Sequence, residues 1–369
     1  MPAKVISDLA ALETLRPGWD ELAIELGRPL SAPAWTLAWW RHAAPAEAEL
    51  RVVVVDDGAV VSAVAPFFVD GRRLRPLASD ASLGVEPLAR PGVERESIGL
   101  VAGALAGAEP QAHIVELRGI REGSPWPRLL CETWPGSRRP VVRREPSMPS
   151  PILELPGLTY EEWLASKSSH FRQRARHVYR GLVAQGGRVR LAEGEEDLAR
   201  GLQEFARLHH ARWRSRGGSG VLTPGVERML FDAARELAAE GRFRLWLVEI
   251  GDRVIGAGVR LAAGGEVSNW LASFDEDRRD VNAPMLMMVA EIEDSLARGD
   301  RRIDLGAGRA ELKSRVADHE EALESFLILP ASPRRPLVEA SLLPGRLRRA
   351  AGARLPPRAK AAAKRVLRR

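Results

Sequence analysis

Residues 301–319, RRIDLGAGRAELKSRVADH, hold the first group of side chains that could do chemistry: a short strand over 302–305, then Gly306, Gly308 and Lys313. Glycines allow a ligand or another backbone to approach closely, and a lysine supplies a compact positive charge. A dinucleotide or Walker fingerprint is excluded, because the third glycine, the downstream acidic residue and a Gly-Lys-Ser/Thr run are all missing. Two interpretations stay open: a ligand-facing loop at a strand edge, or a turn with a surface lysine.

The scarcity of lysine and asparagine points to a second group. The chain has 50 Arg but five Lys and two Asn, so positions that keep Lys or Asn are candidates for function. Asn269 and Asn282 both fall in one strand, turn and helix, with the helix beginning at Pro284. Free backbone N–H groups at that helix start, with Arg278 and Arg279 just upstream, would suit a pyrophosphate. The alternative is an ordinary loop with solvated charges, in which Asn282 caps the helix.

Other catalytic and metal-binding patterns find little support. His209 and His210 stand on a helix with no further ligand at metal spacing, which favours a packed or solvated pair. Cys131 is the only cysteine, and its setting, WPRLLCETW, is typical of a buried helix position. A Gly-x-Ser-x-Gly elbow is missing, so hydrolysis by a Ser-His-Asp triad has no sequence support. The sequence predicts no metal site.

Two hairpins related at long range indicate an internal duplication. Residues 49–69 and 243–263 each hold two apolar, β-branched runs around an acidic-Gly turn, which is a strong hairpin signal. We therefore predict an α/β (α+β) fold of two tandem domains, each a mixed, mostly antiparallel sheet flanked by helices. The predicted boundaries are 1–150, 151–330 and a basic tail over 331–369.

Local signals place the elements of each half. In the second half they predict a long helix from a Thr159/Glu162 capping box to Gly186, helices over 195–218 and from Thr223, and the helix from Pro284. The strands of that half are expected over 188–194, at the hairpin and over 266–273, 302–305 and 323–329. In the first half the predicted helices cover 8–26, 33–43 and 125–134, and the strands 51–55, 60–69, 73–78 and 112–118. The proline-rich stretch 135–157 is expected to be an extended crossover.

The positive charge is concentrated at one end of the chain. Residues 331–369 carry twelve Arg or Lys and one acid, whereas the other 330 residues carry 43 basic and 48 acidic side chains. Such a tail predicts contact with an anionic membrane surface, and it is no evidence for specific DNA binding by the body. An apolar run of membrane-spanning length and a signal peptide are both missing. We therefore expect a cytoplasmic protein, with the tail at the inner face of the membrane.

The order of the elements and several short sequence motifs resemble those of a known family. The run from Trp270 to Ala317, with Asp304, Leu305, Gly306, Gly308 and Lys313 in it, is similar to the strand, helix and "Asp-Leu-Gly-x-Gly … Lys" pattern of double-domain GNAT-type acyltransferases. Within this group the chain resembles Fem-type peptidoglycan aminoacyltransferases and cellulose-biosynthesis acetyltransferase-like proteins. SKSSHFRQRARHVYRGL resembles the Arg-rich helix that opens their second half, and PLASDASLGVEP their strand-end motif, here with Asp80.

The resemblance implies direct acyl transfer to an amine or hydroxyl in the splay between strands 266–273 and 302–305. It implies Asp304, Lys313 and Asp275 as catalytic candidates, and Asn269, Trp270 and Asp80 as substrate-binding candidates. Arg278, Arg279, Asn282 and Ala283 would bind the donor. RRDVNAP replaces the glycine-containing acetyl-CoA signature of ordinary GNAT enzymes. The implied donor is therefore acetyl-CoA, another acyl-CoA or an aminoacyl-tRNA.

The expected function is transfer of an acyl group to a small-molecule or glycan-precursor acceptor in cell-envelope polysaccharide or peptidoglycan-precursor metabolism. The alternative is a catalytically silent adaptor of an envelope-polysaccharide complex, docked to the membrane by its tail. The missing glycine signature favours the adaptor, whereas Asn282 and Lys313 favour the enzyme.

Overall fold

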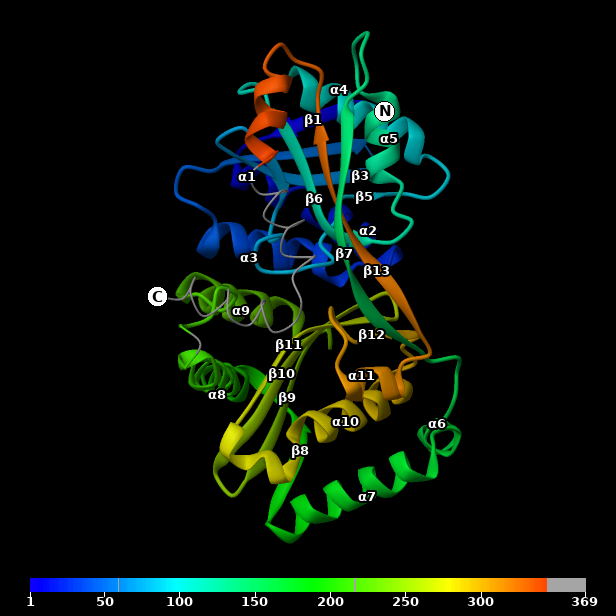
Figure 1. The fold of residues 1–369 in the computed structure, drawn as a ribbon, viewed down its shortest axis with the longest axis vertical. Coiled ribbons are helices and arrows are strands. Elements are labelled where there is room, and N and C mark those ends of the chain that lie inside the picture. The colour runs from blue at the N-terminus through cyan, green and yellow to red at the C-terminus, as the bar shows by residue number, and fades with distance from the viewer. Residues whose placement is uncertain (59, 216, 344–369) are drawn as a thin grey trace.

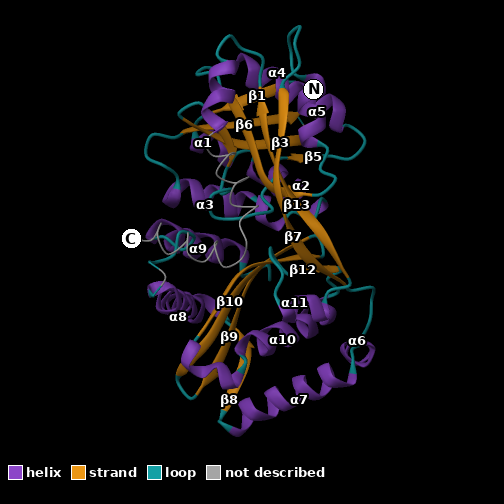
Figure 2. Cartoon of the chain, in the orientation of Figure 1, coloured by secondary structure: helices purple, strands orange, loops and turns teal. Residues whose placement is uncertain are grey.

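The computed structural model describes residues 1–58, 60–215 and 217–343. The described strands form one mixed sheet that runs along the whole molecule, in the order β1-β2-β3-β4-β6-β13-β7-β12-β11-β10-β9-β8, with β5 beside β3. Figure 2 shows helices on both faces of this sheet, with α8 and α9 on one side of the second half and α10, α6 and α7 on the other. The predicted mixed, mostly antiparallel α/β architecture is confirmed.

From β1 and from β8 onward, the elements of the two halves follow a similar order, with α6 and α7 added before the second half and β5 present only in the first. The first half consists of β1 (Ala3–Ile6), α1 (Leu9–Glu13), α2 (Arg16–Glu25), η1 (Pro29–Ser31), α3 (Pro33–Ala43), β2 (Glu49–Asp56), β3 (Val61–Asp70), β4 (Arg73–Pro76), β5 (Leu88–Ala89), α4 (Glu94–Gly107), β6 (Ile114–Arg121), α5 (Trp126–Thr133) and β7 (Val141–Glu154). The second half consists of α6 (Tyr160–Ser166), α7 (Ser169–Ala184), β8 (Gly187–Leu191), α8 (Gly194–Arg214), α9 (Pro224–Leu237), β9 (Phe243–Ile250), β10 (Arg253–Ala263), β11 (Glu266–Phe274), η2 (Glu276–Val281), α10 (Ala283–Arg298), β12 (Arg302–Asp304), α11 (Glu311–Val316) and β13 (His319–Leu329). The hairpins β2–β3 and β9–β10 confirm the predicted duplication.

Each half contains one parallel strand pair in an otherwise antiparallel sheet. These pairs are β4 with β6 and β11 with β12. A parallel pair requires a crossover, and α4 and α10 provide it in the two halves. The internal repeat therefore has two sites at which neighbouring strands can diverge.

The halves exchange their last strands. β7 closes the first half in sequence but pairs with β12 of the second, and β13 closes the second half but pairs with β6 of the first. β7 and β13 also pair with each other over their lengths, and Figure 1 shows them running between the two halves. The predicted boundary at residue 150 therefore falls within β7, and each half of the sheet includes a strand from the other half.

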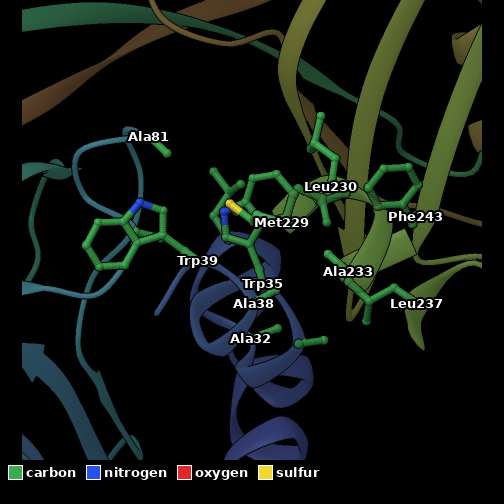
Figure 3. Close-up of a cluster of buried hydrophobic side chains, with 14 of the residues drawn as sticks. Ala32, Trp35, Ala38, Trp39, Ala81, Met229, Leu230, Ala233, Leu237 and Phe243 are labelled. Carbon is green, nitrogen blue, oxygen red and sulfur yellow. The ribbon is translucent and has the colours of Figure 1, made fainter. Parts of the chain in front are cut away.

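The largest hydrophobic core also joins the halves. Trp35 and Trp39 of α3 share this core with Met229 and Leu230 of α9, and all four side chains are almost fully buried. Figure 3 shows these residues side by side, next to Phe243 of β9. Buried tryptophans bring large apolar areas, so this contact contributes strongly to holding the halves together.

Some predicted helices are divided. The helix expected from Thr159 stops at Ser166, and a second begins where the Ser168 hydroxyl accepts the Phe171 N–H. The helix expected over 8–26 is interrupted at Thr14, and α2 restarts with Pro17 in its first turn, where a missing N–H costs nothing. β1 and α4 were not predicted from the sequence. The Thr159/Glu162 capping box and the Thr223 cap are confirmed.

The first residues of the basic tail pack against the body. Val338 and Leu342 contact the small buried cluster of Ile114, Leu327 and Leu329. The remaining tail, 344–369, lies outside the described residues. Among the described helices, none combines the length and the apolar character needed to cross a bilayer.

Candidate active site

The pairing of β11 with β12 ends at the centre of the second half, where the family resemblance implied a splay. They pair in parallel at three positions, the last being Ser268 opposite Asp304, and the pairing ends there. On its other side β11 has a bulge against β10, because Arg260 pairs with Asn269 and Val259 with Leu271, which leaves Trp270 without a partner. A bulge bends the strand and disrupts the ladder. Beyond Ser268 the edge of β11 has no ladder partner in β12, and we call this edge, with the Gly306 loop beside it, the C-terminal splay.

The Gly-x-Gly loop lies against this splay and does not cradle a phosphate. Gly306 has a φ of +81°, and a Cβ added there would lie 2.6 Å from the carbonyl oxygen of Asn269. Only glycine tolerates both the left-handed backbone and this close approach. The Gly308 N–H donates to Pro149 O of β7 at 2.7 Å, which fixes the other end of the loop. The glycines serve close packing of the loop on β11 and β7.

Asp304 and Lys313 hold this loop from two sides. One oxygen of Asp304, Oδ1, accepts from the Gly306 N–H at 2.8 Å and from the Ser150 hydroxyl at 2.5 Å. The Lys313 Nζ donates to the carbonyl oxygens of Gly306 and Ala307 at 2.9 and 3.2 Å. Burial lowers the pKa of Lys313, and the negative charge of Asp304 opposes that shift. Lys313 is thus not a simple surface lysine. Its ammonium group is part-buried and makes two specific contacts.

Two charged residues that the sequence analysis missed lie beneath the splay. The Arg260 Nε of β10 donates to Glu291 Oε2 of α10 at 2.9 Å, and Asn269 Nδ2 donates to the same oxygen at 3.2 Å. Glu291 and Arg260 are 2% and 5% exposed. The sequence did hold a signal for this pair. Glu291 is four residues after Met287 and so falls on the apolar face of the helix, where a carboxylate needs a partner.

The start of α10 differs from the predicted donor site. Asn282 has a left-handed backbone (φ 52°, ψ 51°) and its side chain makes no capping hydrogen bond, so its interpretation as a side-chain cap is wrong. Asparagine is one of the few non-glycine residues that adopt this conformation. Ala283 is buried, and a Cβ added to Gly256 of β10 would lie 2.7 Å from its methyl group. Of the residues 281–285, Met285 lines a pocket of about 410 Å³, but this pocket faces α6 and α7 and residues 306–313 do not contribute to it.

The remaining predicted residues of this region are separated from Lys313. Asp275 follows the far end of β11, roughly 20 Å along the strand from Ser268 at about 3.3 Å per residue. Its carboxylate pairs with Arg253 at 2.5 Å and accepts from the Asp277 N–H. Arg278 contacts Asp280 and Gln185, and Arg279 contacts Glu276. The structure therefore brings Asn269, Asp304 and Lys313 together and places Asp275, Arg278 and Arg279 elsewhere.

Comparison with known proteins shows which folds resemble this chain. Residues 169–314, which contain the C-terminal splay, match the family model described as an acetyltransferase (GNAT) domain. The structure named FemX is similar to the chain with a TM-score of 0.63 and 12% identity, over 92% of this chain and all of the other. The second half of the chain therefore resembles a GNAT acetyltransferase domain. The match to the family model covers its second half, and the similarity to FemX extends the fold over both halves.

Two further solved structures share this fold. A conserved protein of unknown function from Bacteroides thetaiotaomicron is 12% identical with a TM-score of 0.57, over 89% of this chain and all of the other. The C-terminal domain of a protein named as a lysylphosphatidylglycerol synthetase from Agrobacterium fabrum is 10% identical with a TM-score of 0.51, over 80% and 88%. None of the curated proteins compared matches the sequence. These similarities show the fold.

A cavity between the two GNAT-like halves lies beside the splay. Its volume is about 690 Å³, and its walls include Asp80, Ala81, Glu116, Ser147 and Met148. The bulged Trp270 reaches this wall, because its Nε1 donates to Ala81 O at 3.0 Å. Two residues beyond Met148 along β7, Ser150 contacts Asp304. The cavity and the splay are therefore joined in two places: along β7, and through the hydrogen bond between Trp270 and Ala81.

Asp80 and Trp270, both predicted to bind substrate, thus meet at this cavity. Both oxygens of the Asp80 carboxylate accept from Arg75 Nη1 at 2.9 Å, so Asp80 faces the cavity as one partner of an ion pair. Trp270 packs edge-on against Trp35 with ring centroids 5.3 Å apart. The first half of the GNAT-type fold therefore supplies one wall of the site.

His209 supports β11 from the opposite face. Its two ring nitrogens contact the hydroxyls of Ser273 and Ser219 at 3.1 and 2.7 Å. Burial lowers the pKa of His209 to about 4, so the ring is neutral at physiological pH. The described residues hold no group of three or more His, Cys, Asp or Glu arranged to bind a metal ion. His209 is a packed residue, as the sequence favoured.

Proposed function

We propose that this protein is an acyltransferase in which the C-terminal splay binds the reacting acyl group and the cavity between the halves binds the acceptor. The observation that carries the proposal is the continuity of the two along β7. Ser147 and Met148 line the cavity, Pro149 O accepts the Gly308 N–H, and Ser150 contacts Asp304. An acceptor in the cavity is thus within a few residues of the loop that borders the splay.

The proposed chemistry is attack of an acceptor amine or hydroxyl on the carbonyl carbon of a thioester or ester. The new C–N or C–O bond forms, the bond to the donor's sulfur or oxygen breaks, and the leaving group takes up the proton that the acceptor loses. An ammonium group has three N–H donors, and two of those on Lys313 already contact Gly306 O and Ala307 O. The third would stabilise negative charge on the acyl oxygen. Asp304 acts as a positioning residue, because its contacts fix Gly306 and Ser150.

The donor carrier is proposed to be an acyl-CoA, with an aminoacyl-tRNA as the second candidate. Asn282 supports an acyl-CoA, because it takes the left-handed conformation that the missing glycine would otherwise provide. Pro284 supports the second candidate, because it removes a backbone N–H from the helix start where a pyrophosphate would bind. The similarity to FemX and to a protein named as a lysylphosphatidylglycerol synthetase supports a cell-envelope acceptor, such as a glycan precursor.

A catalytically silent adaptor is the weaker candidate. The buried cluster of Arg260, Glu291 and Asn269 speaks against it, because buried ion pairs seldom add stability compared with apolar residues of similar size. A chain that only needed to pack would gain by replacing them.

Thermal melting with a panel of ligands tests the proposed function. The panel comprises acetyl-CoA, longer acyl-CoAs and stable 3′-acylamino-3′-deoxyadenosines, which mimic the end of an aminoacyl-tRNA. A ligand present at a hundredfold its dissociation constant should add about 2.7 kcal/mol of stability. Stabilisation by one carrier series and not the other identifies the donor. A chain that is stabilised by no member of either series is not the enzyme proposed here.

The basic tail is proposed to hold the protein at an anionic membrane. Because Val338 and Leu342 pack on the body, the tail should be cut after residue 343. Residues 344–369 carry ten Arg or Lys and no acid, and each is worth about 1 kcal/mol near an anionic surface at low salt. Co-sedimentation with phosphatidylglycerol vesicles should fall sharply in the 1–343 truncation and in high salt. Equal binding by both chains would assign membrane contact to the body.

A further inference from the structure

A cavity that the proposed function does not use lies at the start of β4 and β6. Its volume is about 400 Å³, which is within the range of small-molecule sites. Arg72, directly before β4, and His113, directly before β6, both line it. The acceptor cavity uses residues 116–119 of β6, but the two cavities share no lining residue among those that the structure describes. A ligand bound here would therefore occupy a site of its own.

The first residues of the basic tail form one wall of this cavity. Arg334 lines it, and Val338 and Leu342 pack on the small cluster that contains Ile114, the first residue of β6. The Val338 N–H donates to Arg334 O at 3.1 Å, so the same turn that packs on the body holds Arg334 in place. Figure 1 shows this segment, in orange-red, at the opposite end of the molecule from α7. Arg334 therefore reaches the cavity from the tail, whereas Arg72 and His113 reach it from the sheet.

Two guanidinium groups at this cavity, those of Arg72 and Arg334, have no carboxylate partner among the described residues. The Nη1 atom of Arg72 donates a long hydrogen bond, of 3.4 Å, to Gln111 O. Burial lowers the pKa of His113, and the positive charges of Arg72 and Arg334 lower it further, so its imidazole is neutral at pH 7. The three side chains are thus close enough to repel one another when all are protonated.

Glu109, the acidic residue of the cavity wall, compensates a different arginine. Burial lowers the pKa of Arg51, and Glu109 is one of two carboxylates that oppose this shift. Arg51 is only 4% exposed, so it needs those carboxylates more than the exposed Arg72 and Arg334 would. The Glu109 Oε2 also accepts the Gln111 N–H at 3.1 Å. Arg72 and Arg334 therefore bring positive charge that this carboxylate does not balance.

The rest of the wall is mainly apolar and includes an indole ring. Trp134, at the end of α5, is half-buried: it packs on the core of the first half and also lines the cavity. Leu74 and Leu105, both almost fully buried, line it as well. A flat aromatic ring gains both burial and stacking against such a wall. The cavity therefore offers an aromatic surface and unbalanced positive charge within one small volume.

We propose that this cavity binds a phosphate monoester carried by a flat ring system, such as a nucleoside monophosphate. A phosphate monoester has a charge of about −1.5 to −2 at pH 7, which matches the two guanidinium groups. Arginine donates paired hydrogen bonds to phosphate oxygens, and a neutral His113 adds one more donor. The ring would stack on Trp134. The inference is independent of the proposed acyl transfer, because the residues that carry it belong to the first half and the tail.

Calorimetry on the full chain tests the proposal with three probes. They are adenosine monophosphate, adenosine, which lacks the phosphate, and ribose 5-phosphate, which lacks the base. The monophosphate should bind at least tenfold more tightly than either fragment, because it alone reaches both the arginines and Trp134. No measurable binding of the monophosphate would overturn the proposal. Either fragment binding as tightly as the monophosphate would do so as well, because the phosphate or the ring would then contribute nothing.

Variants assign the binding to this cavity. Arg72→Ala and Arg334→Ala remove exposed side chains, so both should fold, and each should weaken binding of the monophosphate at least tenfold. Arg335→Ala removes the same charge from the next residue, which does not line the cavity, and should change the affinity less than twofold. Trp134→Leu should lower the preference for the monophosphate over ribose 5-phosphate to threefold or less. Circular dichroism selects the folded variants.

Two results with the variants would contradict the proposal. Unchanged affinity in both Arg72→Ala and Arg334→Ala would place the monophosphate at another site, such as the C-terminal splay. An equal loss in Arg335→Ala would show a general attraction of anions to the basic tail. Because Arg72 lies in the body and Arg334 in the tail, one misfolded variant leaves the other as the test.

Discussion

The two halves have the same parallel strand pair, but they use it differently. In the first half β4 pairs with β6 at only two positions, and the chain after Pro76 then folds back into the space. Leu77 and Ala78 are fully buried there, and a Cβ added to Gly119 of β6 would lie 2.6 Å from Leu83. In the second half the corresponding space is bordered by the Gly306 loop and by buried polar groups. The loop after β4 thus packs Leu77 and Ala78 into the N-terminal splay and also buries Ser79 and Ser82, whereas the C-terminal splay lies over the buried charges of Arg260 and Glu291.

The helices that follow show the same difference. α4 carries Glu94 and Glu96 in its first turn, which places negative charge at its positive end and disfavours an anionic ligand there. α10 has no acidic residue in its first turn. The buried residues of α4 are apolar except for Ser97, whereas α10 buries Glu291. The crossover helix of the second half therefore buries a charged group, whereas that of the first half buries apolar residues and one serine.

The largest effect is expected from breaking the ion pair beneath the C-terminal splay. Glu291→Leu leaves the Arg260 guanidinium buried without its partner, and the free energy of unfolding in urea should fall by about 3–5 kcal/mol. The double variant Arg260→Met/Glu291→Leu should recover most of this loss, because neither charge remains. If the single variant costs under 1 kcal/mol, the pair is solvated and the contrast between the two halves is weaker than described.

His209, which contacts Ser273 on the other face of β11, should make the free energy of unfolding depend on pH. Burial lowers the pKa of His209 to about 4, below the ordinary value of 6.5, so the unfolded chain binds this proton more readily than the folded one. The stability that neutral His209 contributes is therefore fully present above pH 6.5. As the pH falls from 6.5 to 4, the free energy of unfolding drops by up to about 1.4 kcal/mol per pH unit. The unfolding free energy of His209→Gln should fall less steeply over this range. Parallel curves for the two proteins would show that His209 does not titrate there.

Lys313→Met should lower acyl transfer by about a hundredfold, equivalent to about 2.7 kcal/mol of transition-state stabilisation. The melting temperature should also fall, because Nζ holds the carbonyl oxygens of Gly306 and Ala307. Steady-state rates with the donor found by melting would measure the loss. Lys313→Arg is the control for charge: its larger, forked head cannot reproduce both contacts, and it should not restore the rate. Full activity in the Met variant would remove Lys313 from the mechanism.

Replacing one glycine in each half by alanine should have the smallest effect on stability and should separate the two halves most clearly. Gly119→Ala and Gly306→Ala each place a Cβ on a left-handed backbone and 2.6 Å from another atom. In the first half that atom belongs to the movable Leu83 side chain, and the loss should be about 1–2 kcal/mol. In the second it is the Asn269 backbone oxygen, so the loss should be at least as large and donor binding should disappear. Retained donor binding in Gly306→Ala, or lost binding in Gly119→Ala, would reverse the assignment of the two sites.

Local signals in the sequence predicted much of this arrangement, and long-range contacts account for the rest. The hairpins, the capping box at Thr159 and the splay between β11 and β12 follow from periodicity, turn residues and the family resemblance. The exchange of β7 and β13 has no local signal, because an extended strand is compatible with either neighbour. The family resemblance pointed to Asp304, and the scarcity of lysine and the nearby Gly-x-Gly pointed to Lys313. Arg260 and Glu291 meet only after a helix packs on the sheet. Asp275 was placed in the site because it follows the strand that lines the splay, but its carboxylate pairs with Arg253, roughly 20 Å along the strand from Ser268.

Hydrogen–deuterium exchange with a bound donor tests the central claim most directly. The full chain would be compared with and without acetyl-CoA and 3′-glycylamino-3′-deoxyadenosine, each at a hundredfold its dissociation constant. The account predicts slower exchange at residues 269–274 and 304–313, with little change at 76–84 and 114–121. Protection confined to the first-half segments would place the donor in the N-terminal splay and contradict the account.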